Sequence, residues 1–267
     1  MIFRQLFDPE TSTYTYLLAD ESSRKAVLID SVLGQIDRDV TLLRELELEL
    51  CYALETHVHA DHVTASGRLR ETLGCKVGVS EIAGVANADL QLRDGEIIRF
   101  GERELEMVST PGHTIGCSTY VCHAAGMAFT GDVLLVRGCG RTDFQQGDAA
   151  VLFTSVRDRL FSLPDDTRIY PGHDYHGRMM STVGEEKRFN LRIGLDKSVD
   201  QFVEIMNGLN LAYPKQMDVA VPANLESGLG ISEADLDRRV AAATGSVASV
   251  MEESGRQDAE IWMGSGI

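Results

Sequence analysis

Residues 54–62 read LETHVHADH, and the interpretation of the whole chain depends on this stretch. It contains three of the seven histidines of a 267-residue chain together with two carboxylates: Glu55, His57, His59, Asp61 and His62. A hydrogen-bonded His–Asp pair on a surface loop explains any one of these residues taken alone. Imidazoles and carboxylates crowded into one turn are instead typical of a site for Zn, Fe or Mn. We call residues 55–62 the histidine turn.

The histidine turn follows a predicted strand. The apolar run LCYAL at 50–54 is typical of a buried strand. Open α/β sheets usually bind their ligands beyond the carboxyl ends of their strands. His57 and His59 are two positions apart, so in an extended segment both side chains face the same side. Two imidazoles can therefore reach a single ion.

Three later motifs each place one further ligand-type residue in or beside a glycine-containing turn that follows an apolar stretch. They are TPGHT with His113, TGD with Asp132 and YPGHD with His173. Each of these residues alone is equally compatible with a structural role. Together with the histidine turn, they predict that four strand ends deliver nitrogen and oxygen ligands to one edge, with no cysteine in the set.

The rest of the chain predicts alternating strands and helices. Apolar stretches bounded by turn residues predict strands at 2–7, 14–19 and 26–29, and further strands between 76 and 132. Helical patterns cover 36–46, 63–73 and 148–161, and capping boxes begin helices at Thr182, Ser198 and Ser232. The chain thus contains two halves, each with strands followed by helices. Two halves of this kind indicate helices flanking two packed sheets. We expect a core over 1–180, completed by a helical segment and tail over 181–267.

The bulk composition excludes several classes of partner. The formal net charge of -16 argues against nucleic acid or an anionic membrane as the main partner, because both require a basic surface. No apolar run reaches the roughly 18 residues that cross a bilayer, and the N-terminus does not read as a signal peptide. Five cysteines without a CxxC pair fit a reducing compartment. We therefore expect a cytoplasmic protein.

The motifs THVHADH, PGHT, TGD and PGHD resemble the metal-binding motifs of the metallo-β-lactamase superfamily over roughly residues 10–180. The resemblance implies an α/β protein with an αββα sandwich, a metal site at one edge between the two sheets and a C-terminal helical extension. It does not fix the reaction, because this superfamily hosts many chemistries.

Two families of enzymes within the superfamily fit the chain. A dinuclear hydroxyacylglutathione hydrolase of the glyoxalase II type would use seven residues that are all present here: His57, His59, His113, Asp61, His62, His173 and the bridging Asp132. Such an enzyme hydrolyses a thioester with two metal ions. A third hypothesis is a scaffold that the metal only stabilises. It requires a metal whose coordination positions are all occupied by the protein, whereas the ligand set here leaves positions open.

Three longer segments closely resemble the persulfide dioxygenases, also called sulfur dioxygenases. They are VRGCGRTDFQQGD (136–148), YPGHDYHGRMMSTVGEEKRFN (170–190) and QMDVAVPANLESG (216–228). The resemblance implies oxidation of glutathione persulfide by O2 to sulfite and glutathione, in a homodimer. It implies one Fe(II) per chain on His57, His113 and Asp132, with zinc able to replace iron during heterologous purification. The residues left to orient the ligands would be His59, Asp61, His62 and His173.

A glutathione-based substrate carries two carboxylates, so we expect a local cationic pocket despite the acidic total. Arg141 is the first candidate because its planar guanidinium suits a carboxylate; an internal salt bridge is the alternative. Tyr175 could offer its hydroxyl to the substrate or only pack. Lys215 could meet a carboxylate or remain solvated. Cys139 could line the same pocket as a small apolar residue without a catalytic role.

Overall fold

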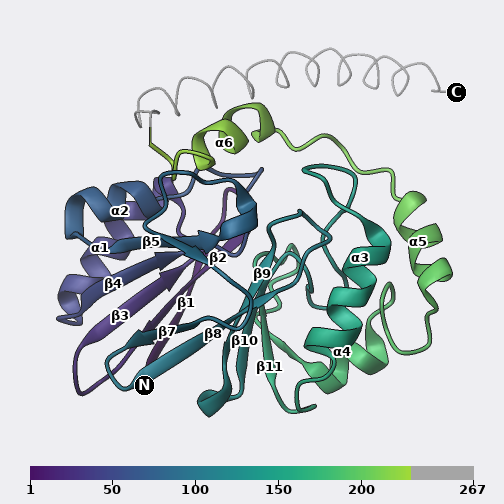
Figure 1. Cartoon of the computed structure of the whole chain (residues 1–267), viewed down its shortest axis with the longest axis horizontal. Helices are drawn as coiled ribbons and strands as arrows, with labels where there is room; N and C mark the ends of the chain where they lie inside the picture. The colour runs from purple at the N-terminus through teal and green to yellow at the C-terminus, as the bar shows by residue number, and fades with distance from the viewer. Residues whose placement is uncertain (230–267) are drawn as a thin grey trace, which may run out of the picture. The chain divides into compact units, whose positions relative to one another are not determined.

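The structure of the chain, a computed structural model, describes residues 1–229. These residues form two six-stranded sheets (Figure 1). The first sheet contains, in order, β1 (Ile2–Asp8), β2 (Thr13–Ala19), β3 (Lys25–Ile29), β4 (Glu49–Leu54), β5 (Lys76–Ser80) and β6 (Leu90–Leu92). The second contains β12 (Ser181–Thr182), β11 (Arg168–Pro171), β10 (Met127–Gly131), β9 (Ser118–Cys122), β8 (Arg103–Ser109) and β7 (Ile97–Phe100).

Alternation along the strands separates three packed layers. In β2, Tyr16 and Leu18 belong to the core between the sheets, whereas Leu17 faces the layer formed with α1 (Ile36–Glu45) and α2 (Ser66–Leu73). In β9, Tyr120 likewise faces the inner core, and Val121 faces a third layer. Successive side chains of a strand point to opposite faces, so apolar runs of this kind bury both faces of each sheet.

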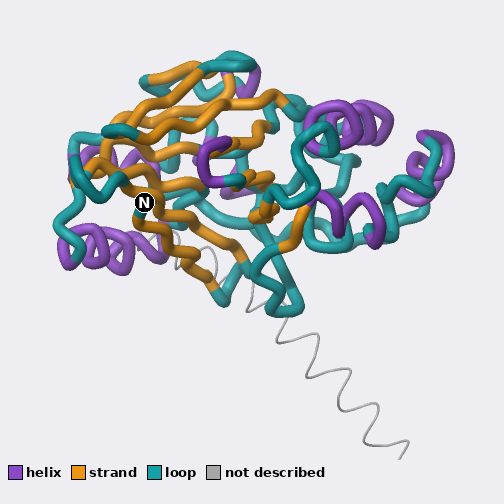
Figure 2. The backbone as a smooth tube through the Cα atoms, turned by 90° about the horizontal axis from the view of Figure 1, so that it is seen from below, coloured by secondary structure: helices purple, strands orange, loops and turns teal. Residues whose placement is uncertain are grey.

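Helices on the outer face of the second sheet complete the αββα sandwich. They are α3 (Ala149–Thr154), which continues as a π-helical turn over Ser155–Leu160, α4 (Val183–Phe189) and α5 (Val199–Asn207). Figures 1 and 2 show helices on both sides of the two sheets. Val183 and Phe202 share a buried core with Ile169 of β11, so residues after 180 contribute to the outer layer on the second sheet. The capping box at Ser232 and the tail lie outside the described residues.

The two sheets meet at the edge where the predicted motifs lie. The backbone N–H of Ser118 donates to the carbonyl of Thr56 at 2.8 Å, and the hydroxyl of Tyr120 donates to the carbonyl of Glu55 at 2.9 Å. Gly131 has a φ of 50°, and a Cβ there would lie 2.4 Å from Thr56 Oγ1. The glycine of the TGD motif thus allows the second sheet to approach the histidine turn.

A last helix, α6 (Met217–Asn224), follows a long connection from α5. Among the described residues, no helix combines the length and apolar character that crossing a bilayer requires.

Candidate metal centre

Three side chains from three strand ends converge at this edge. His57 follows β4, His113 follows β8 and Asp132 follows β10 directly. Each offers one ligand atom, and these atoms all lie within 4.8 Å of one another. His57 is 2% exposed, so the group is largely shielded from bulk water. Two imidazoles and one carboxylate at such separations form a compact set for one metal ion.

Hydrogen bonds decide which nitrogen of His57 faces this set. The hydroxyl of Thr56 donates to Asp30 Oδ2 at 2.8 Å, so it can only accept from His57 Nδ1, which lies 2.9 Å away. The protonated Nδ1 leaves Nε2 as the nitrogen with a free lone pair. Burial, followed by the neighbouring histidines, also lowers the pKa of His57 well below its usual value, so the ring is neutral.

His113 is oriented in the same way by a backbone group. Its Nδ1 lies 2.6 Å from the carbonyl oxygen of Arg141, and a carbonyl only accepts, so Nδ1 carries the proton. His113 Nε2 then faces Asp132 Oδ2 at 3.8 Å. The main-chain carbonyl of Arg141 thus fixes the orientation of the His113 ring.

The third member, Asp132, is held by His173. His173 Nδ1 donates to Asp132 Oδ1 at 2.6 Å, and its Nε2 donates to Asp61 Oδ2 at 2.9 Å. Burial alone would lower the pKa of His173, but the carboxylates of Asp132 and Asp61 raise this pKa well above its usual value. His173 is therefore an imidazolium between two carboxylates, and Asp132 Oδ2 is left for the set.

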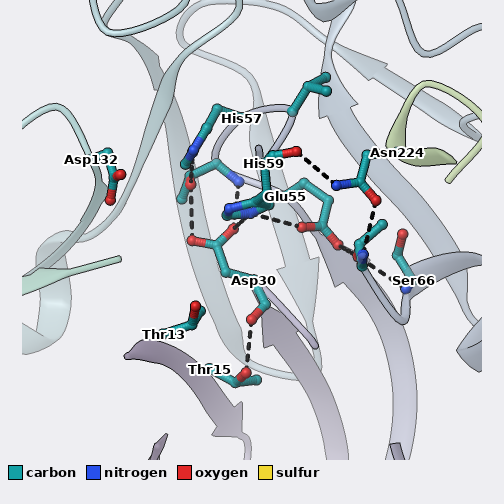
Figure 3. A network of polar contacts seen from close by, with 12 residues as sticks. Thr13, Thr15, Asp30, Glu55, His57, His59, Ser66, Asp132 and Asn224 are labelled. Atoms are coloured by element: carbon teal, nitrogen blue, oxygen red, sulfur yellow. Dashed lines mark hydrogen bonds and ion pairs between the residues drawn. The ribbon is translucent and has the colours of Figure 1, made fainter. Parts of the chain in front are cut away.

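Of the remaining predicted residues, His59 belongs to a buried polar network with Asp30 and Glu55 (Figure 3). His59 Nε2 lies 3.2 Å from both Asp30 Oδ1 and Glu55 Oε2. Burial would lower the pKa of His59, but these carboxylates raise it to about 10. Its Nδ1 is buried without a hydrogen-bond partner among the described residues. Asp30 belongs to no sequence motif and was not among the predicted site residues.

A second group is also compact enough to hold an ion. His59, Asp61 and His62 offer ligand atoms within 4.8 Å of one another. However, Asp61 Oδ2 already receives hydrogen bonds from both His62 Nδ1 and His173 Nε2, each at 2.9 Å. All seven predicted residues therefore lie at one edge, but the four outside the first set bond mainly to one another or to nearby carboxylates.

A cavity of about 750 Å³ opens onto the first set. Its wall includes the three candidate substrate residues: Arg141, Tyr175 and Lys215. Its size lies within the range of sites for small organic ligands. Cys139 also lines it and is 2% exposed.

Arg141 is paired within the protein. Its guanidinium forms two bonds to the carboxylate of Asp143, at 2.6 and 2.7 Å. It also donates to the carbonyl of Ala212 at 2.7 Å and lies over the ring of Phe144. The alternative of an internal ion pair thus describes this conformation, and the arginine supports the segment that carries Lys215.

Tyr175 and Lys215 are placed differently. The Tyr175 side chain is 69% exposed, and its ring stacks parallel to that of His173 at 6.2 Å. Within residues 1–229, Lys215 has no carboxylate at ion-pair distance, and neither has Arg192, a further cation of the cavity wall. Arg192 donates to the carbonyl of Cys139 at 2.7 Å. Arg192 belongs to no sequence motif and was not predicted.

Comparison with known proteins agrees with this geometry. The family model described as metallo-beta-lactamase superfamily matches residues 8–173. The human protein named persulfide dioxygenase ETHE1, mitochondrial, is 54% identical over 230 residues, which cover 86% of this chain and 89% of the human one. The crystal structure of ETHE1 from Myxococcus xanthus superposes with a TM-score of 0.83 at 52% identity, covering 85% of this chain and all of that one.

A hydroxyacylglutathione hydrolase, GloC of Haemophilus influenzae, is more distant. It is 35% identical over 191 residues, which cover 64% of this chain and 88% of that protein. The match to the ETHE1 proteins is closer in identity and includes the segments outside the shared metal motifs. The chain therefore belongs to the metallo-β-lactamase superfamily and, within it, to the family of the persulfide dioxygenases.

Proposed function

We propose that the chain oxidises glutathione persulfide with O2 and water to sulfite and glutathione. The outer sulfur of the persulfide is oxidised and leaves as sulfite, O2 is reduced, and glutathione retains the inner sulfur. The observation that carries the proposal is the convergence of His57, His113 and Asp132 at one cavity, with one ring nitrogen or carboxylate oxygen of each engaged by a hydrogen bond. The 54% identity to a named persulfide dioxygenase supports it.

We propose that His57, His113 and Asp132 hold one Fe(II). Two histidines and one carboxylate are the ligands of non-haem iron oxygenases, and they leave coordination positions open. Iron supplies one-electron chemistry towards O2 that zinc lacks. The chain itself contributes orientation: Thr56 and the Arg141 carbonyl fix the two rings, and His173 holds the carboxylate.

Cations of the cavity wall are proposed to bind the substrate carboxylates. Lys215 and Arg192 suit this role because no described carboxylate neutralises them. Arg141 binds a substrate carboxylate only if that carboxylate replaces the carboxylate of Asp143, whose side chain is 55% exposed. The hydroxyl of Tyr175 at the cavity wall is a proposed donor to the bound persulfide. These contacts would place the outer sulfur near the metal set.

The second candidate is a dinuclear hydrolase of S-D-lactoylglutathione. The compact group His59, Asp61 and His62 favours it. His59 Nδ1 and His62 Nε2, both buried without a hydrogen-bond partner among the described residues, also fit it. The higher identity to a named persulfide dioxygenase, 54% against 35% for the named hydrolase, favours the first candidate.

The first experiment is O2 uptake by the iron-loaded protein with glutathione persulfide. We expect one sulfite for each O2 consumed, and no uptake by the metal-depleted protein. Asp132→Ala and His113→Ala should lose iron and turnover together. Full iron content without uptake, combined with hydrolysis of S-D-lactoylglutathione, would overturn the proposal in favour of the hydrolase.

A further inference from the structure

The C-terminal residue of α6 reaches the histidine turn from far along the chain. Asn224 is 4% exposed, and Figure 3 shows its side chain beside His59 and Ser66. Its Nδ2 donates to the carbonyls of His59 at 2.9 Å and His62 at 2.8 Å. Its Oδ1 accepts from the backbone N–H of Thr64 at 2.9 Å. One side chain thus satisfies three buried backbone groups of the turn and the residues that follow it.

Only a side-chain amide matches this pattern. It presents two donors on one atom and an acceptor on the other, as the two carbonyls and one N–H require. A carboxylate would place an oxygen against two carbonyl oxygens. An alanine would leave all three backbone groups without partners, and unpaired buried groups are costly.

The segment after Asn224 is seated closely against the same region. The N–H of Gly67 donates to the carbonyl of Ser227 at 2.9 Å, and a Cβ at Gly67 would lie 2.4 Å from that oxygen. At the other end of α6, Lys215, Gln216 and Met217 line the substrate cavity. One short helix therefore connects the cavity wall with the back of the metal centre.

We infer that Asn224 is a positioning residue for the metal set. It holds the backbone on both sides of Asp61, and Asp61 holds His173, which in turn orients Asp132. Its bond to the His59 carbonyl also restrains the turn two residues after His57. The inference rests on the proposed metal set, but it does not depend on which reaction that set catalyses.

The test compares Asn224→Asp with Asn224→Ala. Asn224→Asp keeps the side-chain size and the acceptor for Thr64 but loses both donors, so we expect Fe(II) affinity to fall 10–100-fold, as for other groups that orient metal ligands. In the metal-free protein, hydrogen exchange of the Thr64 amide should stay slow in Asn224→Asp and accelerate in Asn224→Ala. Chelator competition and exchange mass spectrometry measure the two effects.

Ser227→Ala is the matched control. It removes the 2.6 Å bond from Ser227 Oγ to Asn87 Oδ1 in the same segment without touching the histidine turn. We expect a lower melting temperature with Fe(II) affinity within twofold of the parent. Where Asn224→Ala does not fold, Asn224→Asp decides.

Wild-type affinity in Asn224→Asp, or an equal loss in Ser227→Ala, would overturn the inference. Failure of the dioxygenase proposal is recognised separately, because the parent protein would then bind iron but take up no O2. For iron-saturated Asn224→Asp, kcat should fall more than KM changes, since the cations of the cavity wall are untouched.

Discussion

Cys139 lies in the wall of the substrate cavity, but its thiol is protonated at neutral pH. Burial raises the pKa of Cys139 to about 11. A thiol reacts with persulfides and alkylating agents as the thiolate, so Cys139 should not exchange sulfur with the substrate. We expect Cys139→Ala to retain kcat within about threefold, because no reacting group is lost. A loss of more than tenfold with intact iron would assign the thiol a role in the reaction.

The cations of the cavity differ in how far they are already paired. Arg192→Ala should raise KM by roughly 10- to 100-fold, about 1.4–2.7 kcal/mol of charge-assisted contact, and leave kcat nearly unchanged. Arg141→Ala should act on KM as well, partly by freeing the segment near Ala212. Steady-state kinetics with glutathione persulfide measure both. Arg159→Ala, which removes an exposed ion pair with Asp94, is the control. A fall in kcat at constant KM in Arg192→Ala would refute the binding role.

Motif residues could be predicted at this scale, and isolated residues could not. Short-range spacing brought His57, His59, Asp61 and His62 into one turn, and turn glycines marked the other three positions. Asn224 and Arg192 have no such signal, because their contacts join segments far apart in the sequence. The pairing of Arg141 with Asp143 depends on a loop conformation that composition does not determine.

At the scale of helices and strands, the features that could be predicted depend on residues close together in the sequence. The capping interactions at Thr182 and Ser198 are present, since each depends on residues three positions apart. The strand β12 was not predicted, because a run of two residues carries no detectable period. The helix predicted over 148–161 changes to a π-helical turn after Thr154. The hydrophobic period of the sequence alone does not distinguish the wider turn of a π-helix from that of an α-helix.

Asp89 connects two elements and gives a prediction for acid pH. Its carboxylate accepts from the N–H of Val77 in β5 at 2.8 Å and from Arg70 of α2 at 3.2 Å. Burial would raise the pKa of Asp89, but these bonds lower it below 3.8. The stabilisation is therefore complete above the unfolded pKa and is lost as pH falls through the folded one.

Asp89→Asn should accordingly reduce the free energy of unfolding by about 0.5–1 kcal/mol at pH 7, a small effect because the carboxylate is partly exposed. The difference should shrink as pH falls through the lowered pKa of Asp89 in the folded state. Urea denaturation at a series of pH values measures it, and a difference that persists at acid pH would exclude the ionised form as the cause.

At the scale of the whole molecule, the metal set joins the two sheets. His57 follows a strand of the first sheet, whereas His113 and Asp132 follow strands of the second. An ion bound there should stabilise the fold, by about 4 kcal/mol at a free concentration 1,000-fold above its Kd. Removing metal from the anaerobic Fe(II) protein should lower its melting temperature. Asp132→Ala should show no such metal-dependent shift; an equal shift would place the ion elsewhere.

The αββα architecture was predictable because it follows from strand and helix order together with the four motifs. Oligomeric state and compartment were not, since neither depends on a local pattern. The homodimer and the cytoplasmic location remain predictions; sedimentation equilibrium of the purified chain tests the first. The relatives of highest identity cited above include a protein whose name specifies mitochondria, so composition alone is a weak guide to compartment.

The position of Asn224 has a consequence for biosynthesis. His62 and Asn224 are 162 positions apart, and contacts of such separation close late. A nascent chain that has not yet emerged from the ribosome as far as residue 224 already contains every member of the metal set, but its histidine turn lacks the amide that holds it. We therefore expect tight binding of the proposed iron only after residue 224 has joined the fold.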